Sequence, residues 1–259
     1  MSRPPADVTE RFGTRAAAYA RARPGYPDFA VAALVRALDL APGAVVVDLG
    51  CGTGLSSEAF LRAGFAVIGV EPNAAMRAHA ARDLAGYGGF RAVDGRAEAT
   101  GLPAGAADVL IAAQAFHWFD VPAARAEALR ILRPPARAAL LWNDRLAQGS
   151  AFATGYEDLL QRFSGDYLEI RHRHGRTQNV AAFFGGRPWR TITVGHSDTL
   201  DYERLADRLN SASYVPAPDD PRHEPMMDAL RRLFAATAQQ GYVTMQFETR
   251  ILCGELSPA

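Results

Sequence analysis

Three glycines and a carboxylate stand together where a short apolar segment ends. Asp48 follows three consecutive valines, and Gly50, Gly52 and Gly54 come at every second position after it. Glycines let the backbone turn sharply and approach a ligand closely, and a helix that begins behind such a turn presents unpaired N–H groups. A carboxylate here repels a pyrophosphate but suits a ligand that carries an ammonium or sulfonium charge. The pattern predicts a binding turn, with Asp48 either contacting a ligand amine or holding the glycine loop.

Two further side chains could do chemistry. Glu71 ends the next apolar segment, residues 66–70, and one carboxylate can accept hydrogen bonds from two adjacent ribose hydroxyls. His117 lies in a cluster of aromatic residues, and an imidazole that titrates near neutrality can take a proton from an acceptor molecule. A lone histidine among apolar neighbours is also common in protein cores, so a structural role for His117 stays open.

The elements that must position these residues alternate along the first 145 residues. We expect strands at 44–49, 65–70, 90–93, 108–113 and 137–143, and helices at 28–38, 55–63, 73–84 and 121–132. Strands without apolar alternation are buried on both faces of parallel sheets, and alternation with helices indicates crossover units. The fold class is therefore α/β: a doubly wound, mostly parallel seven-stranded sheet with helices on both faces and a small helical cap. Ligands of such sheets bind at the carboxyl ends of the strands.

The remaining residues read as parts of the same domain, 1–259. We expect helices at 150–163, 202–209 and 221–240, strands at 190–199 and 242–252, and mixed structure at 165–186. The single domain then comprises an N-terminal arm (1–27), a cofactor-binding core (28–145), cap and substrate elements with a late strand (146–240), and a closing strand (241–259).

Composition excludes several classes of function. The chain has 28 basic and 28 acidic residues, so no bulk field favours nucleic acid or an anionic membrane. All the basic residues are Arg. The absence of Lys excludes a phosphate-binding loop with its Gly-Lys-Ser/Thr, pyridoxal Schiff-base catalysis and protein-kinase catalysis.

Metal, disulfide and membrane signals are missing. His172 and His174 lie in an arginine-rich segment with no evident third ligand, so no metal is expected. Cys51 and Cys253 form no disulfide or metal pattern, which makes the reducing cytoplasm the expected compartment. No apolar run is long enough to span a bilayer. The sequence does not predict an oligomeric state.

Five segments together resemble the class I S-adenosylmethionine-dependent methyltransferases, in particular their type 11 small-molecule group. The resemblance spans about residues 10–145 and rests on Val47-Asp48-Leu49-Gly50-Cys51-Gly52-Thr53-Gly54, Val70-Glu71-Pro72-Asn73 with Met76, Gly95-Arg96-Ala97-Glu98-Ala99, Ala113-Gln114-Ala115-Phe116-His117-Trp118-Phe119, and Ile131-Leu132-Arg133-Pro134 with Leu140-Leu141-Trp142-Asn143. It implies S-adenosylmethionine as cofactor and SN2 transfer of its methyl group to a small-molecule acceptor.

The resemblance also implies roles for individual residues. Many relatives carry Asp where this chain has Arg96, so we assign the adenine contact to the backbone of Ala97 and Glu98. A Tyr…Arg-Pro element like the one here closes over the cofactor in relatives, with Arg23 pairing the cofactor carboxylate. The expected cofactor-binding residues are Tyr19, Arg23, Asp48, Gly50, Cys51, Gly52, Gly54, Glu71, Pro72, Met76, Ala97, Glu98 and Gln114. The expected acceptor contacts are His117, Trp118 and Tyr26, with His117 as the catalytic candidate.

Two other functions remain open at this point. A nicotinamide-dependent oxidoreductase uses a similar sheet, but its Gly-x-Gly-x-x-Gly/Ala fingerprint would place a small residue where Leu55 stands. A non-catalytic module that only binds S-adenosylmethionine has the same cofactor motifs. Methylation of nucleic acid is disfavoured, because Gln114-Ala115-Phe116-His117 replaces the Asn/Asp-Pro-Pro-Tyr/Phe type of base-methylating motif.

Overall fold

The computed structural model describes residues 25–165, 167, 177–212 and 214–256. One seven-stranded sheet runs through this part of the chain in the order β3-β2-β1-β4-β5-β7-β6. β7 pairs antiparallel with both of its neighbours, and the other pairings are parallel. This confirms the predicted fold class. The strands are β1 (Val45–Leu49), β2 (Ala66–Val70), β3 (Phe90–Val93), β4 (Ala107–Ala113), β5 (Leu132–Arg145), β6 (Trp189–Leu200) and β7 (Val243–Glu255).

Helices cover both faces of the sheet, as the apolar character of both strand faces requires. The described helices are α3 (Asp28–Leu38), α4 (Leu55–Arg62), α5 (Ala74–Asp83), α6 (Val121–Ile131), α7 (Ala151–Phe163), α9 (Thr177–Phe183), α10 (Tyr202–Asn210) and α11 (His223–Thr237), with a short 3-10 helix η1 (Phe116–Trp118). Local sequence explains several starts: the side chains of Asn73, Asp120 and Ser150 each accept a hydrogen bond from the first turn of the helix that follows.

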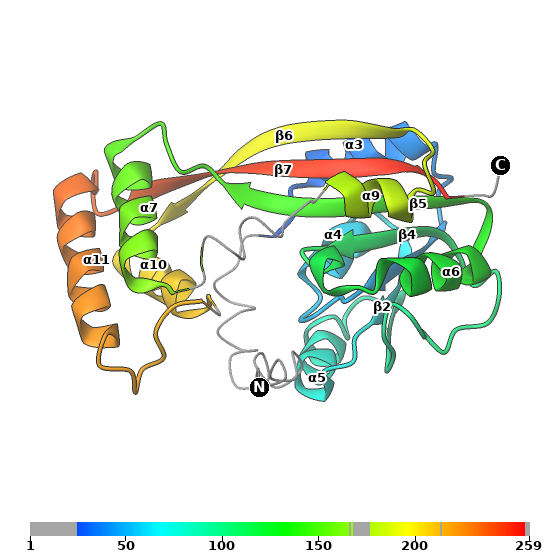
Figure 1. Cartoon of the computed structure of the whole chain (residues 1–259), viewed down its shortest axis with the longest axis horizontal. Helices are drawn as coiled ribbons and strands as arrows, with labels where there is room; N and C mark the ends of the chain where they lie inside the picture. Colours follow the sequence, from blue (N-terminus) through cyan, green and yellow to red (C-terminus); the bar gives the residue numbers. More distant parts are fainter. Residues whose placement is uncertain (1–24, 166, 168–176, 213, 257–259) are drawn as a thin grey trace.

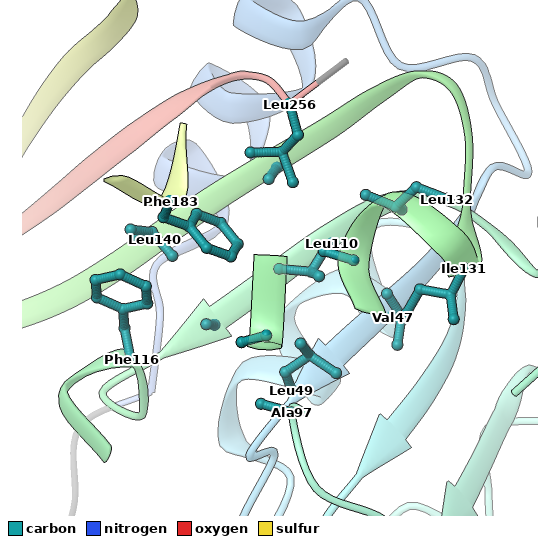
Figure 2. Close-up of a cluster of buried hydrophobic side chains, with 14 of the residues drawn as sticks. Val47, Leu49, Ala97, Leu110, Phe116, Ile131, Leu132, Leu140, Phe183 and Leu256 are labelled. Carbon is teal, nitrogen blue, oxygen red and sulfur yellow. The ribbon is translucent and has the colours of Figure 1, made fainter. Parts of the chain in front are cut away.

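Alternate residues of the strands supply two cores. Val46, Val109 and Leu141 pack with α3 and α4 on one face. Val47, Leu110 and Leu140 pack with α6 and α9 on the other face. Figure 2 shows this second cluster, in which Phe116 and Phe183 lie beside each other with ring centroids 5.3 Å apart. Both faces of the central strands are therefore closed, and their carboxyl ends are held at one edge.

A third core forms the cap. β5, β6 and β7 run on beyond the central sheet toward α7, α10 and α11, which stand together at one end of the molecule (Figure 1). Leu160, Leu205 and Leu230 of these helices are buried with Met245 and Phe247 of β7. The predicted cap segment, 146–240, does not lie wholly in this third core. α9, which belongs to the segment, packs on α6 in the central part of the fold.

Two elements differ from the sequence prediction. α9 lies within residues 165–186, where we expected mixed structure. β5 begins at Leu132, five residues before the expected start at 137, because Leu132 already pairs with Ala107 of β4. Pro134 and Pro135 suggest a loop, since proline cannot donate to a sheet, but the strand resumes its pairing at Arg137.

Candidate functional site

The glycine turn after β1 adopts a conformation that requires glycine. Gly50, Gly52 and Gly54 have φ values of 69°, 57° and 90°, in the left-handed region that costs other residues energy. The N–H groups of Gly50 and Cys51 donate to the Val70 carbonyl oxygen at 2.8 and 3.2 Å. The turn is therefore fastened to the end of β2, and α4 begins directly behind it.

Gly50 also brings the end of β4 against the turn. A Cβ atom at Gly50 would lie 2.7 Å from the Cβ of Ala115 and 3.9 Å from the ring of Phe119. Any larger residue at position 50 would push the two segments apart. The predicted cofactor turn and the predicted acceptor segment are thus in direct contact.

Asp48 lies beneath this turn and is fully buried. Its Oδ2 accepts hydrogen bonds from the hydroxyls of Ser56 and Ser57 at 2.6 and 2.7 Å. Its Oδ1 is buried with no hydrogen-bond partner among the described residues. Burial, opposed by the two serine hydroxyls, raises the pKa of Asp48 to about 6. Of the two predicted roles, this geometry favours holding the loop, since Asp48 ties β1 to the first turn of α4.

Glu71 lies at the end of β2 and faces the turn. Its Oε2 accepts a hydrogen bond from the N–H of Gly52 at 3.0 Å, and its Oε1 accepts one from the N–H of Asn73 at 2.9 Å. The side chain is buried, and burial raises its pKa against the two backbone hydrogen bonds. Each oxygen keeps a lone pair for a further donor.

The residues after Glu71 complete this corner. Asn73 caps α5 by accepting from the N–H of Met76 at 3.0 Å. Met76 is buried, and its sulfur would lie 3.9 Å from a Cβ at Gly52. Arg77 donates to the carbonyl oxygens of Glu71 and Pro72 at 2.7 and 3.2 Å. The structure therefore brings Glu71, Pro72 and Met76 together with the glycine turn, and their contact with a cofactor stays a prediction.

Cys51 is buried within the turn as a free thiol. Burial raises the pKa of this thiol, with the carboxylates Asp48 and Glu71 adding to the effect. A Cβ at Gly69 would lie 2.8 Å from the Cys51 sulfur. Cys51 fills space in the turn, and a buried thiol kept protonated is a poor nucleophile.

The predicted adenine-side residues lie in the loop after β3. Ala97 is buried and joins the same core as Leu49, beside which it lies in Figure 2. The Arg96 side chain is 70% exposed. Glu98 Oε1 accepts a hydrogen bond from the N–H of Asp120 at 2.9 Å. The Glu98 side chain thus holds the start of α6, and the adenine contact of its backbone stays a prediction.

The predicted acceptor segment forms a turn at the end of β4. Gln114 has a φ of 54°, and its Nε2 donates to the carbonyl oxygen of Asn143 at 3.0 Å. His117 lies in η1 with its ring 4.8 Å from the ring of Trp118. Trp118 is 39% exposed, whereas Phe116 is buried in the core. His117 and Trp118 are therefore accessible in part, at the same edge of the sheet as the glycine turn.

Of the predicted site residues in the N-terminal arm, the structure describes Tyr26. The Tyr26 side chain is buried in the core formed with α3 and α4, and its carbonyl oxygen accepts from Arg62 at 3.3 Å. This packing supports a structural role, while the predicted substrate contact stays a prediction. Tyr19, Arg23, His172 and His174 lie outside the described residues.

Sequence reasoning missed four supporting residues. Ser56 and Ser57 hold Asp48, and Glu127 of α6 accepts hydrogen bonds from Thr100 at 2.8 and 2.5 Å. The contacts of Asp48 with Ser56 and Ser57 could have been predicted, because the two serines follow the glycine turn closely in the sequence. The second pair is separated by 27 positions, and no local pattern connects its members.

No group of three or more His, Cys, Asp or Glu among the described residues is placed to hold a metal ion. None of the described helices combines the length and apolar character that crossing a membrane requires.

The chain is similar in sequence to several known proteins. Residues 47–140 match the family described as methyltransferase domain. An uncharacterized methyltransferase from Mycobacterium tuberculosis is 35% identical over 145 residues, which cover 54% of each chain. The chain thus spans about half the length of the curated relatives it matches first. An uncharacterized methyltransferase-like protein from Schizosaccharomyces pombe is 23% identical, and the similarity covers 96% of each chain.

Solved structures show the same fold over most of the chain. A proposed type II methyltransferase from Anaeromyxobacter dehalogenans is 25% identical, with a TM-score of 0.66 and coverage of 92% of this chain and 99% of that one. A proposed methyltransferase from an antibiotic biosynthesis pathway of Anabaena variabilis, 22% identical with a TM-score of 0.58, covers 86% of this chain and 97% of its own; at that identity it supports the fold alone. Residues 47–140 are therefore similar to the methyltransferase-domain family, and the fold of the described residues is similar to that of these solved structures.

Proposed function

We propose that this protein transfers a methyl group from S-adenosylmethionine to a small-molecule acceptor. The observation that carries the proposal is the hydrogen bond between Glu71 and the glycine turn. The Glu71 carboxylate is fixed by the N–H groups of Gly52 and Asn73, at 3.0 and 2.9 Å, and keeps acceptor capacity on both oxygens. A ribose with two adjacent hydroxyls is the ligand group that matches such a carboxylate.

The residues present fit the cofactor of the family. The left-handed glycines keep side chains out of the turn, as a close approach by a ligand requires. Asp48 and Glu71 place negative charge around it, which disfavours a pyrophosphate and favours a sulfonium or ammonium group. The edge of Phe119 lies beside Gly50, and an aromatic ring adds attraction for a cation. Gly50, Gly52, Glu71 and the backbone of Ala97 would hold the adenosyl part.

The chain's own residues would mainly align the reactants. The sulfonium of S-adenosylmethionine supplies an activated methyl group, so no covalent intermediate on the protein is needed. Gln114, pinned to Asn143, would shape the methyl-side end of the site. His117 would take a proton from an acceptor hydroxyl or amine at its ring nitrogen, and Trp118 would contact the acceptor. Orientation of this kind contributes several kcal/mol to catalysis.

A small molecule is the proposed acceptor because the chain has no net positive charge that would favour a polyanion. Basic and acidic residues balance at 28 each, and nucleic-acid binding depends on an excess of basic charge. We also propose the reducing cytoplasm as the compartment, because Cys51 and Cys253 are both free thiols.

Calorimetry followed by a transfer assay tests the proposal. We expect S-adenosylmethionine and S-adenosylhomocysteine to bind with micromolar dissociation constants, and a nicotinamide dinucleotide not to bind. Labelled methyl groups should then pass to the small-molecule fraction of an extract. Binding of the nicotinamide dinucleotide alone would support the oxidoreductase, and tight cofactor binding without transfer to any fraction would support the non-catalytic module. A product lost on nuclease treatment would indicate a nucleic-acid acceptor.

A further inference from the structure

The loop between β3 and β4 is fastened to α6 by one buried carboxylate. Thr100, which is fully buried, donates from its N–H and its hydroxyl to Glu127 Oε1 at 2.8 and 2.5 Å. The same hydroxyl accepts from the N–H of Leu102 at 3.2 Å. Thr100 therefore takes part in three hydrogen bonds. Glu127, which lies on α6, is its partner in two of them.

Glu127 is suited to this task because its charge is compensated. It is 9% exposed, and Arg130 donates to its Oε2 and Oε1 at 2.7 and 2.6 Å. The hydrogen bonds from Arg130 and Thr100 hold the pKa of Glu127 at about 2, against the opposing effect of burial. The carboxylate stays ionised, and hydrogen bonds to an ionised acceptor are among the stronger ones.

The position of Thr100 sets the path of the residues before it. A Cβ at Gly95 would lie 2.7 Å from the Thr100 carbonyl oxygen, so the backbones at the two ends of this turn are in tight contact. Arg96 and Ala99 exchange two backbone hydrogen bonds of 3.1 Å each. Ala97 and Glu98 form the tip of this closed turn, and any movement of Thr100 would carry the tip with it.

The other end of the loop adjoins the ribose-binding corner. The N–H of Glu71 donates to the carbonyl oxygen of Val93 at 3.1 Å. Arg77 connects the Glu71 carbonyl oxygen, at 2.7 Å, with the Asp94 carboxylate, at 3.2 Å. The turn at residues 95–100 therefore follows directly from the corner that holds Glu71, and the proposal below places at this turn the base of a nucleoside whose ribose contacts Glu71.

Side chains at the tip offer little for reading a base. The Arg96 side chain is 70% exposed and carries no acceptor. Glu98 Oε1 accepts from the N–H of Asp120, and Glu98 Oε2 forms an ion pair with Arg96 Nε at 3.7 Å. Ala97 has no polar group in its side chain. The backbone groups of the tip are left to recognise the base, and backbone recognition depends on how rigidly the loop is held.

We propose that Glu127 is a positioning residue that sets the selectivity of this loop for adenine through Thr100. The proposal rests on the proposed function, since it assumes that the nucleoside is that of S-adenosylmethionine. Loosening the Glu127–Thr100 contact would weaken discrimination at the exocyclic group of the base more than it weakens binding of the ribose and amino-acid parts.

Calorimetry with two matched ligands tests this role: S-adenosylhomocysteine and S-inosylhomocysteine, which carries an oxygen in place of the adenine amine. We expect wild type to prefer the adenosyl ligand. Glu127→Leu should lower that preference about tenfold, the loss of roughly 1.4 kcal/mol of selectivity. Glu127→Gln keeps an oxygen for both Thr100 donors and should retain most of the preference. Thr100→Val, a milder change, should lower it in part and serves if Glu127→Leu does not fold.

Arg130→Gln is the matched control. It removes the partner of the Glu127 charge while leaving the Thr100 contacts, so it should lower the melting temperature without changing the preference. An unchanged preference in both Glu127→Leu and Thr100→Val overturns the proposal, as does an equal loss of affinity for both ligands. A wild type that binds both ligands equally well overturns it while leaving the proposed function intact. A wild type that binds neither ligand overturns both.

Discussion

The Glu71 carboxylate accepts a hydrogen bond from the N–H of Gly52 at 3.0 Å. This contact joins the acid that ends β2 to the glycine turn that ends β1, although 19 positions separate them. The turn and the acid therefore form one preorganised unit, and a ligand that needs both meets them already in place. Preorganisation of this kind lowers the entropic cost of binding.

Replacing Glu71 should weaken cofactor binding more than it weakens the fold. Glu71→Gln retains one acceptor oxygen but turns an amide N–H₂ group toward a backbone donor, so we expect the dissociation constant of S-adenosylhomocysteine to rise about 10- to 100-fold, from roughly 1.5–3 kcal/mol of lost charged hydrogen bonding. Calorimetry measures it. Glu58→Gln, on the exposed side of α4, is the control and should bind like wild type; equal binding by both variants would contradict the role of Glu71.

Alanine substitutions at Gly50 and Gly64 distinguish the effect of backbone strain from the effect of a steric clash. Gly50→Ala and Gly64→Ala both place a side chain at positive φ, 69° and 86°, which costs about 1–2 kcal/mol. Only at Gly50 would the new Cβ meet an atom, that of Ala115 at 2.7 Å, because Gly64 has open space. We therefore expect both variants to lose stability in urea unfolding, and only Gly50→Ala to lose affinity for S-adenosylhomocysteine. Adding Ala115→Gly should restore part of that affinity, and its failure to do so would argue against the contact.

Asp48 should make stability depend on pH in an unusual direction. Its pKa is raised from 3.8 to about 6, mainly by burial, so the folded protein holds a proton that the unfolded chain releases. The stability that this provides is present below about pH 4 and is lost as pH rises through 6, by about 3 kcal/mol in total. Unfolding curves of wild type and Asp48→Asn should show the variant gaining stability relative to wild type between pH 4 and 7.

Asp108→Asn is a control of opposite sign. Burial raises the pKa of Asp108, but the Val45 N–H and Arg133 outweigh this effect and leave the pKa lowered. The stability from Asp108 is present above the usual pKa of Asp and is lost as pH falls. This variant should therefore lose stability relative to wild type as pH rises, and identical pH profiles for the Asp48 and Asp108 variants would refute the assignment.

Removing the imidazole of His117 should affect transfer and leave cofactor binding alone. With a hydroxyl or amine acceptor identified by the transfer assay, we expect His117→Gln to lower kcat by about 100-fold, the scale of a general base. Calorimetry should give an unchanged dissociation constant for S-adenosylhomocysteine. His223→Gln, in α11, is the matched control and should keep full activity. Wild-type kcat in His117→Gln would leave the residue a structural role in η1.

Local sequence was sufficient to predict the sheet and the turn. The valine run of β1, the glycines after it and the acid that ends β2 each carry their signal within a few residues, and the structure places them as expected. Such signals are reliable because the periodicity of burial and the need for positive φ act on the residues themselves.

Several features that sequence reasoning missed depend on long-range contacts. α9 has seven residues, too few to show a helical period, and it is stabilised by burying Val180 and Phe183 against the core around Phe116. The role of Glu98 depends on the N–H of Asp120, which only the folded chain brings near. The role of Asp48 depends on Ser56 and Ser57, which lie close to it in the sequence. A carboxylate in a motif shows that charge is needed there, but not which donor it meets.

The most direct test of the account is a crystal structure of the protein with S-adenosylhomocysteine. We predict that the ribose hydroxyls lie within hydrogen-bonding distance of the Glu71 carboxylate, with the ligand backbone against Gly50 and Gly52. A ligand bound elsewhere, or a phosphate-bearing molecule in its place at the glycine turn, would contradict the account.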